Sequence, residues 1–586
     1  MNPRLRLSLI QANPITGDVH NNTELVLSAI ESERASDLIV FTECFLTGYP
    51  VNDLVLRPGF LRGVEEGIAR VRAAVIEADG PAVLVGAPMA AATLPYNAAY
   101  LIEPSGDVRI VRKSELPNTD VFDERRTFAM ADPAEAAPLL FRGFRLGVQI
   151  CEDMWHGPVS RALADECAEA LIVINGSPYQ RGKAAARARN AEARVRATGL
   201  PLVYVNQVGG QDDLVFDGRS FTMNTDGAVL NASAFRPDVM RVSLVREGAR
   251  VHVEGVDEFA DPVAPVAAGG APVEIAEDYA ACVLGLRDYA DKTGSPRVFV
   301  GVSGGLDSAL VLSMAVDALG PDRVVGVMMP SEHTGQESLD LADDLMTRLG
   351  VRRRVVPITG AYSAVDAAVS PEAESLATEI GVVATHAITR QNYQARVRGV
   401  ILMGLSNALG GIVLSTGNKS ELAVGYSTLY GDMVGGFNPL KSVYKSDAFV
   451  MARWRNACDP AVNGLIGPDC PIPEGIIDRP PTAELAPGQT DQENLGAYEV
   501  LDAVLRLMIE ERMGPQAAAR RITRDIGEAR IAELCGGKSP FEYAERVAGM
   551  LRAAQYKRVQ APPGVKLNET DFGLGWRYPV AGRYAL

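Results

Sequence analysis

The chain has 586 residues, of which 47% are hydrophobic and 22% charged, a composition typical of ordinary globular proteins. One hydrophobic core rarely serves so long a chain, so we expect two large domains. Lysine and arginine number 57 against 73 acidic residues, and the net charge of −16 disfavours a nucleic-acid partner. Apolar runs stay short of the roughly 18 residues of a membrane-spanning helix, so we expect no membrane association.

Cysteine and histidine usage also excludes some classes of protein. The seven cysteines include no Cys-x-x-Cys pair, which disfavours a disulfide framework or a thiolate metal site and fits a reducing cytoplasm. The five histidines form no ligand-like pair, which disfavours a zinc centre and a Ser-His-Asp triad. Any catalysis must therefore depend on other side chains.

Residues 259–275 are rich in Pro, Gly and small residues and have no apolar period, which is typical of a linker. We therefore expect domains at 1–258 and 276–586. The chain begins with a strand-like stretch, and further short apolar runs of strand length alternate in the first domain with helix-like segments such as 182–198. The runs lie at residues 37–41, 82–86, 146–150, 171–174 and 202–205. This pattern predicts a layered α/β domain.

In the second domain, strand and helix patterns alternate more regularly. Strands are expected at 297–302, 324–329 and 353–358, with helices at 307–319 and 336–349. Such alternation implies right-handed crossovers and a doubly wound, Rossmann-like parallel sheet, with ligands at the carboxyl ends of its strands. Residues 459–492 are rich in Pro and Gly, and a loop of this length is often functional or mobile.

Three reactive side chains, Glu43, Lys113 and Cys151, each follow a strand-like run of the first domain. Strand ends in a layered α/β domain converge on one side. A cysteine attacks as thiolate, so it needs a base for its proton and a positive group for the developing oxyanion. Taken singly, each residue has a plain alternative, because a lone Cys is usually a buried apolar residue and Glu and Lys are usually surface charges.

The stretches around these residues resemble the nitrilase superfamily over about residues 1–255. They are residues 41–49, 112–118 with 121–124, and 147–155. The resemblance implies an αββα sandwich that hydrolyses carbon–nitrogen bonds through a thioester. It also implies that Glu43 is the general base, Lys113 the oxyanion stabiliser and Cys151 the nucleophile.

Residues 175–187 resemble the glutamine-binding stretch of the amidotransferase branch of that superfamily. The resemblance implies that Ser177 and Lys183 contact L-glutamine. Glutaminase members usually carry Tyr after Leu-Pro-Asn, whereas this chain has Thr119 there. We assign Thr119 to the glutamine site as well, and the difference concerns the hold on the substrate rather than the chemistry.

A glycine loop joins a strand to a helix in the second domain, where residues 298–308 read Val-Phe-Val-Gly-Val-Ser-Gly-Gly-Leu-Asp-Ser. Glycines let backbone amides form an anion nest, the helix N-terminus adds partial positive charge, and the two hydroxyls can bind phosphate oxygens. A Gly-Gly pair alone could be a tight turn with capping residues, but the full Ser-Gly-Gly-x-Asp-Ser favours pyrophosphate.

This loop lacks the Gly-Lys-Ser/Thr of a Walker A motif and resembles the ATP pyrophosphatase superfamily, whose members cleave ATP between its α and β phosphates. The resemblance implies a set of ATP-binding residues on and after the loop. They are Val302, Ser303, Gly304, Gly305, Leu306, Asp307, Ser308, Ala309 and, further on, Thr416.

Residues 390–396, 414–432, 439–445 and 556–558 resemble the NAD synthetase family, through most of 275–586. The resemblance implies that deamido-NAD contacts Asn392, Glu421, Tyr426 and Lys557, and that Asp307 and Glu421 hold Mg²⁺. Without it, Glu421 would be read as a solvated loop acid.

These resemblances imply ATP-dependent amidation of deamido-NAD through an adenylated intermediate. A carboxylate oxygen is a poor leaving group until AMP is attached, and Mg²⁺ offsets phosphate charge in that transfer. Ammonia in water is mostly protonated, so we expect L-glutamine to supply it and an internal passage to carry it. We also expect a homo-oligomer.

Two alternative functions stay open at this point. The same loop family includes amidotransferases acting on a nucleotide base or a tRNA. A tRNA acceptor would call for basic patches, and many such enzymes carry catalytic thiols near the loop; neither is evident in the sequence. Alternatively, the first domain is a degenerate interaction scaffold and the second uses free ammonia, which the intact Glu43, Lys113 and Cys151 disfavour.

Overall fold

The computed structural model describes residues 3–256, 263–481, 491–582 and 584. The chain forms two compact units, Met1–Ala264 and Pro265–Leu586, each with its own hydrophobic core. Helix α5 (Val273–Lys292) begins inside the stretch predicted as a linker, after Pro272 as its N-cap. Residues 257–262 of that stretch lie outside the described residues. Among the helices that the structure describes, none is both long and apolar enough to cross a membrane.

The first unit contains two large sheets and a two-stranded ribbon. One sheet has the order β15-β14-β1-β2-β3-β4-β5, with β1 Arg4–Gln11, β2 Leu38–Val40, β3 Ala82–Met89, β4 Tyr96–Ile102, β5 Val108–Arg112, β14 Asp238–Glu247 and β15 Arg250–Gly255. The other has the order β13-β12-β9-β8-β7-β6, with β6 Leu139–Phe141, β7 Phe144–Ile150, β8 Ala170–Asn175, β9 Leu202–Asn206, β12 Phe221–Met223 and β13 Val229–Asn231. The ribbon pairs β10 Val208–Gln211 with β11 Leu214–Asp217.

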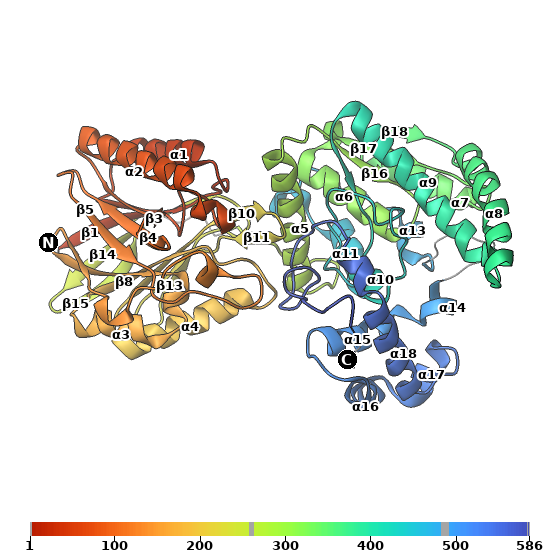
Figure 1. Ribbon diagram of the computed structural model, residues 1–586. Helices are drawn as coiled ribbons and strands as arrows, with labels where there is room; N and C mark the ends of the chain where they lie inside the picture. Colours follow the sequence, from red (N-terminus) through yellow and green to blue (C-terminus); the bar gives the residue numbers. More distant parts are fainter. Residues whose placement is uncertain (1–2, 257–262, 482–490, 583, 585–586) are drawn as a thin grey trace. The chain divides into compact units, whose positions relative to one another are not determined.

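The two large sheets pack face to face, and each is covered by helices on its outer face (Figure 1). Alternate residues of β1, such as Leu7, meet alternate residues of β8, such as Ile172, in one buried cluster, as the two-residue period of a strand requires. Helices α1 (Val19–Ser32) and α2 (Pro58–Ala78) cover one sheet, and α3 (Gly157–Asp165) and α4 (Lys183–Thr198) cover the other. The predicted αββα sandwich is confirmed.

A glycine brings the turn after β2 close to its neighbouring strand. A Cβ at Gly86 of β3 would lie 2.4 Å from the carbonyl oxygen of Thr42 and 2.5 Å from the backbone nitrogen of Cys44. No side chain fits in that space, so the chain beside Glu43 can lie directly on β3. This close approach positions a residue of the first candidate site.

The second unit contains a four-stranded, fully parallel sheet in the order β18-β17-β16-β19. Its strands are β16 Val298–Gly301, β17 Val324–Met328, β18 Arg352–Val355 and β19 Ile412–Leu414, and the helices of its layers include α6 Leu306–Leu319, α7 Gln336–Arg348, α8 Thr359–Ile380 and α9 His386–Leu409. Helix α6 packs on β16 and β17, while Val397 and Leu402 of α9 pack with Phe299. Helices therefore lie on both faces, and the predicted doubly wound sheet is confirmed.

A helical bundle, which the sequence analysis did not predict, completes the second unit. It consists of α15 Tyr498–Ile509, α16 Pro515–Ile526, α17 Glu528–Leu534 and α18 Pro540–Ala553 around a shared core (Figure 1). The Pro- and Gly-rich stretch before the bundle holds two short helices, α12 Pro460–Asn463 and α13 Glu474–Asp478. Its residues 482–490 lie outside the described residues. The remaining helices are α10 Lys419–Val424, α11 Lys445–Ala457, α14 Asp491–Leu495 and α19 Gln555–Arg558.

Candidate active sites

The first unit brings the predicted Glu43, Lys113 and Cys151 together in its interior. Glu43 follows β2, Lys113 directly follows β5, and Cys151 directly follows β7. The side chains of Glu43 and Lys113 are fully buried, and Cys151 is 7% exposed. The Nζ of Lys113 lies 2.6 Å from Oε1 of Glu43, and the backbone N–H of Gly176 donates to Oε2 at 2.9 Å. The charges of both residues act on the Cys151 thiol.

A fourth residue, Glu124, belongs to this cluster. Its Oε2 lies 2.8 Å from the Nζ of Lys113, and its Oε1 accepts a hydrogen bond from the hydroxyl of Tyr49 at 2.7 Å. Burial, together with the charge of Glu43, raises the pKa of Glu124 to about 7. Glu124 lies in a stretch that resembles the nitrilase superfamily, but no role was predicted for it from the sequence. The sequence does place this acidic residue between two apolar stretches, residues 121–122 and Phe128, and such a position could have indicated a buried carboxylate.

Cys151 has an unusual backbone conformation that a short network fixes. Its φ is +48°, in the left-handed region that residues other than glycine rarely adopt. The buried carboxylate of Asp153 accepts the N–H of Ile150 at 3.0 Å and, from the segment after Lys113, the N–H of Ser114 at 3.0 Å. This carboxylate ties the turn of the cysteine to the segment of the lysine.

The electrostatics of the cluster keep the cysteine protonated. Burial raises the pKa of the Cys151 thiol well above its usual value, and the charge of Glu43 raises it further. Burial alone would lower the pKa of Lys113, but the carboxylates of Glu124 and Glu43 raise it well above its usual value. The site therefore holds a thiol beside an ammonium, and the thiol needs a base before it can attack.

The three residues assigned to glutamine lie in different surroundings. Ser177 is buried, and its hydroxyl accepts a hydrogen bond at 3.0 Å from Nε of Arg187, whose Nη1 lies 2.8 Å from Asp217. The Nζ of Lys183, the first residue of α4, lies 4.4 Å from the centre of the Trp155 ring, four residues after Cys151. Thr119 is exposed in the segment between Lys113 and Glu124.

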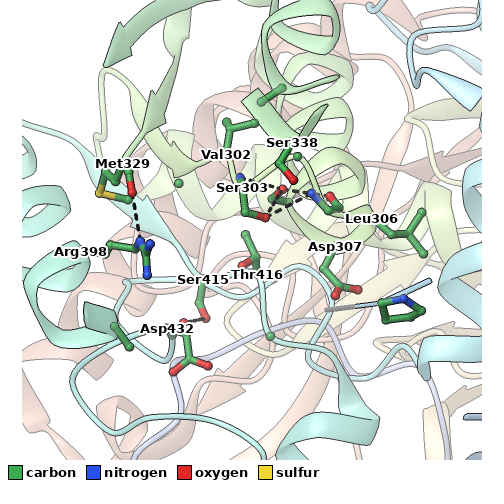
Figure 2. A pocket seen from close by; sticks show the side chains of 18 of the residues that line it. Val302, Ser303, Leu306, Asp307, Met329, Ser338, Arg398, Ser415, Thr416 and Asp432 are labelled. Carbon is green, nitrogen blue, oxygen red and sulfur yellow. Dashed lines mark hydrogen bonds between the residues drawn. The ribbon is translucent and has the colours of Figure 1, made fainter. Parts of the chain in front are cut away.

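The second unit has a cavity at the carboxyl ends of its strands, lined by most of the residues predicted to bind ATP and deamido-NAD. Of the predicted residues, the lining includes Val302, Ser303, Gly304, Gly305, Leu306, Asp307, Ser308, Thr416, Glu421 and Tyr426. Figure 2 shows several of them around the cavity.

Three predicted residues of the second unit lie behind the cavity lining. Ala309 is buried inside α6. Asn392 accepts a hydrogen bond at 2.8 Å from the hydroxyl of Thr428, which itself lines the cavity. The Nζ of Lys557 donates at 2.7 Å to the carbonyl oxygen of Gly425, next to Tyr426. Asn392 and Lys557 therefore support the segment that carries the lining residues.

The glycine loop is shaped by contacts that only glycine permits. Gly304 has a φ of +81°, and a Cβ there would lie 2.3 Å from the carbonyl oxygen of Ser338. The hydroxyl of Ser308 accepts the N–H of Ser303 at 3.2 Å and donates to the carbonyl oxygen of Gly305 at 3.0 Å. The loop ends at the N-terminus of the 14-residue helix α6, whose partial positive charge favours an anion.

The two residues predicted to hold Mg²⁺ both lie near the ammonium of one lysine. Oδ2 of Asp307 pairs with the Nζ of Lys445, which lies 3.8 Å from Oε1 of Glu421. Oδ1 of Asp307 is buried and takes no hydrogen bond from the residues that the structure describes. Such an unpartnered carboxylate oxygen suits a metal ligand, so this pair fits Mg²⁺. Within the described ranges no group of three His, Cys, Asp or Glu could hold a metal, so phosphate oxygens or water would complete the shell.

Further charged residues line the cavity that were not assigned to it from the sequence, among them Asp432 and Arg398. Burial raises the pKa of Asp432 to about 6, and the N–H of Thr428 donates to its carboxylate at 2.5 Å. Arg398 of α9 donates to the carbonyl oxygen of Met329 at 3.1 Å, as Figure 2 shows. Asp432 ends the stretch 414–432, and Arg398 follows shortly after the stretch 390–396. Both stretches resemble the NAD synthetase family, and this nearness could have pointed to the two residues.

Two family models match the chain, one in each unit. The carbon–nitrogen hydrolase model matches residues 6–250, and the NAD synthase model matches residues 278–560. The fold and the two sites therefore define a class of enzyme in which a carbon–nitrogen hydrolase is joined to a NAD synthase.

Relatives over the full length of the chain narrow this class. The chain is 43% identical over 591 residues to a glutamine-dependent NAD(+) synthetase of Rhodobacter capsulatus, covering 100% of this chain and 99% of that one. It is 39% identical to that of Thermotoga maritima, covering 99% of each. A solved glutamine-dependent NAD+ synthetase of Acinetobacter baumannii matches with a TM-score of 0.71 at 34% identity, covering 99% of this chain and 98% of that one. The chain belongs to the glutamine-dependent NAD(+) synthetase family.

Proposed function

We propose that the chain makes NAD by ATP-dependent amidation of deamido-NAD, with ammonia taken from L-glutamine at Cys151. The products are NAD, L-glutamate, AMP and diphosphate. The observation that carries the proposal is the buried cluster in which the ammonium of Lys113 lies 2.6 Å from the carboxylate of Glu43, beside a cysteine in a left-handed turn. The same chain carries the glycine-loop cavity needed for ATP.

In the first reaction, Glu43 takes the proton of the Cys151 thiol and the thiolate attacks the carboxamide carbon of glutamine. One N–H of Lys113 is directed to Glu43 and another to Glu124, and a third can hold the oxyanion that forms. The C–N bond then breaks, and the proton passes from Glu43 to the nitrogen, which leaves as ammonia. A glutamyl thioester remains on Cys151.

Water completes the first reaction by attacking the thioester. Glu43 accepts a proton from this water, the C–S bond breaks, and the Cys151 thiolate recovers the proton as glutamate leaves. A single carboxylate serves both half-reactions because it regains its charge after each. The raised pKa of the thiol fits this cycle, since the cysteine returns to the protonated state between turnovers.

In the second reaction, a carboxylate oxygen of deamido-NAD attacks the α-phosphorus of ATP and diphosphate leaves. Ammonia then attacks the acyl-adenylate and displaces AMP. Ser303, Ser308 and the loop amides hold phosphate oxygens, and Lys445 offsets their charge. Asp307 and Glu421 would hold Mg²⁺, which would offset further phosphate charge.

We propose that ammonia passes internally between the two sites and that glutamine hydrolysis is coupled to adenylate formation. Ammonia released into water at neutral pH is mostly protonated and cannot attack a carbonyl carbon. The amount of ammonia leaked per NAD formed tests this coupling. Equal leakage with and without ATP and deamido-NAD would exclude it.

The activity itself is tested by NAD formation from deamido-NAD, ATP and Mg²⁺, with either glutamine or ammonium chloride as nitrogen source. The native chain should use both sources, and Cys151→Ala should keep only ammonium. If a folded native preparation forms no NAD from either source, the assigned acceptor is wrong. If Cys151→Ala still uses glutamine, the assigned nucleophile is wrong.

We also propose that the chain forms a homo-oligomer through its second unit. Two packed helices there, α8 and α9, leave large apolar side chains in solvent, as few monomeric surfaces do. Leu376 and Ile380 of α8 are 55% and 63% exposed, and Ile388 and Val400 of α9 are 61% and 71% exposed. A second copy of the chain could cover them by two-fold pairing. The expected cytoplasmic location stays a prediction.

A further inference from the structure

Asn97, on strand β4, has a fully buried side chain that contacts the catalytic cluster on two sides. Its Nδ2 donates a hydrogen bond at 2.8 Å to Oε1 of Glu43. Its Oδ1 accepts one at 3.4 Å from the thiol of Cys44. Its backbone carbonyl oxygen also accepts the N–H of Lys113 at 2.8 Å. One asparagine thus joins the strand to both the glutamate and the lysine of the cluster.

The chemistry of its neighbours allows the amide of Asn97 only one orientation. Turned the other way, Oδ1 would face the carboxylate of Glu43, and two acceptors would meet without a proton between them. Burial, with the charge of Glu43, raises the pKa of the Cys44 thiol well above its usual value, so Cys44 keeps its proton and donates to Oδ1. The amide is therefore held with Nδ2 toward the carboxylate.

The three donors to Glu43 divide unevenly between its two oxygens. Oε1 accepts from Asn97 and Lys113, while Oε2 accepts the N–H of Gly176. A carboxylate oxygen has two good lone-pair directions, so Oε1 is filled and Oε2 keeps one direction for a proton. The donors come from three separate segments, which fixes the plane of the carboxylate.

We propose that Asn97 is a positioning residue for the general base: it holds the carboxylate of Glu43 turned so that Oε2 receives the Cys151 proton. The proposal rests on the role of Glu43 proposed above. A neutral donor suits this place because the cluster already contains the charges of Glu43, Glu124 and Lys113. A further cation would weaken the base, and a further carboxylate would repel it.

The first test is Asn97→Leu, which keeps the approximate volume and removes both hydrogen bonds. Only part of the general-base contribution of ~10²–10⁴ should be lost, so we expect kcat for glutamine hydrolysis to fall roughly tenfold to 100-fold with a small change in KM. NAD formation from ammonium should stay at the native rate, which also reports a folded second unit.

Asn97→Asp gives a second test, in which the rate of glutamine hydrolysis is expected to depend on pH. While protonated, the introduced carboxyl can donate to Oε1 of Glu43 as the amide does; once ionised, it repels Glu43. Glutamine hydrolysis by this variant should approach the native rate at low pH and fall away as the pH rises. A role confined to packing would not produce this profile.

The nucleophile can be followed directly by its alkylation with iodoacetamide over a range of pH. Peptide mass spectrometry at Cys151 is needed because Cys167 and Cys470 are exposed and will react as well. In Asn97→Leu the alkylation of Cys151 should be slowed together with the hydrolysis. Asn224→Leu is the matched control, since the side chain of Asn224, in the same unit, hydrogen-bonds to backbone groups of Val253.

The outcomes separate this inference from the proposed function. If Asn97→Leu, Asn97→Asp and Cys44→Ala all hydrolyse glutamine within about twofold of the native rate with unchanged pH profiles, Asn97 does not position the base. If Asn97→Leu fails to fold, Asn97→Asp and Cys44→Ala still show whether Asn97 positions the base. If Glu43→Gln keeps native hydrolysis, the general base itself is misassigned, whatever Asn97 does.

Discussion

Lys445 pairs with Asp307 inside the nucleotide cavity, and the same ammonium lies 3.8 Å from Glu421. The Lys445 side chain is only 4% exposed, so this pairing takes place largely out of water. The single positive charge of this lysine offsets part of the charge of the two carboxylates. Were Asp307 and Glu421 to hold Mg²⁺ as proposed, the ammonium would be near enough to contact phosphate oxygens of a bound nucleotide.

We therefore expect Lys445→Met to lower kcat/KM for ATP at least about tenfold, since a positive group near transferring phosphate stabilises the transition state. The measurement is NAD formation from ammonium at varied ATP. Lys445→Arg, which keeps the charge, should lose less. Glutamine hydrolysis measured without ATP and deamido-NAD should change little, and unchanged ATP kinetics in Lys445→Met would contradict this role.

The raised pKa of Glu124 should appear in the pH dependence of stability. Between its usual value of 4.5 and its folded value of about 7, the folded chain binds more protons than the unfolded chain. The free energy of unfolding therefore falls as the pH rises through this window, by at most about 1.4 kcal/mol per pH unit.

Glu124→Gln cannot ionise, so this fall should be absent from it. The melting temperature of the native chain, relative to that of Glu124→Gln at the same pH, should fall from pH 4.5 to pH 7 and become constant above pH 7. Comparing the two proteins at each pH removes the contribution of the other acidic groups. A difference that does not vary with pH would show that Glu124 stays ionised in the folded state.

Gly304 should not tolerate any side chain. We expect Gly304→Ala to abolish measurable ATP binding and lower the melting temperature, because the added Cβ would lie 2.3 Å from the Ser338 carbonyl oxygen at a φ of +81°. Calorimetric titration with ATP measures the first effect. Gly360→Ala is the matched control, because a Cβ at Gly360 of α8 meets nothing within 4 Å and should leave ATP binding intact.

Much of the fold could be predicted because its central strands are buried on both faces. Strands such as β8 and β9 are apolar over most of their length, which the sequence displays directly. The helical bundle at residues 498–553 was not predicted. Its helices have apolar faces, but which element covers each face depends on contacts between segments far apart in the chain.

The site could be predicted where a reactive residue follows a strand. Glu43, Lys113 and Cys151 were singled out by this position, their roles were implied by the resemblance to the nitrilase superfamily, and the structure brings the three side chains together. Asn97 and Glu124 gave weaker signals, because their roles arise only when separate segments fold over the same carboxylate and ammonium. A single asparagine in an apolar strand such as β4 looks like any polar strand residue until Glu43 is placed beside it.

Association through the second unit predicts a specific effect at Val400. We expect Val400→Glu to shift the chain toward a smaller species in sedimentation velocity, because a charge would be buried against a second copy. Val462→Glu serves as a control, since Val462 is a 48% exposed apolar residue on α12, apart from α8 and α9. A native chain that sediments as a monomer at micromolar concentration would overturn the proposed association.

Thr119 predicts a change in substrate hold without a change in chemistry. Thr119 is exposed in the segment between Lys113 and Glu124. The aromatic ring of a tyrosine at this position would therefore have room to turn toward the glutamine site. We expect Thr119→Tyr to lower KM for glutamine several-fold, on the order of 1 kcal/mol of added contact, while kcat stays constant because the contact is equal in ground and transition states. Thr119→Val, which adds no reach, should keep the native KM. A change in kcat with a constant KM would instead place Thr119 at the reacting atoms, and no change in either would remove it from the glutamine site.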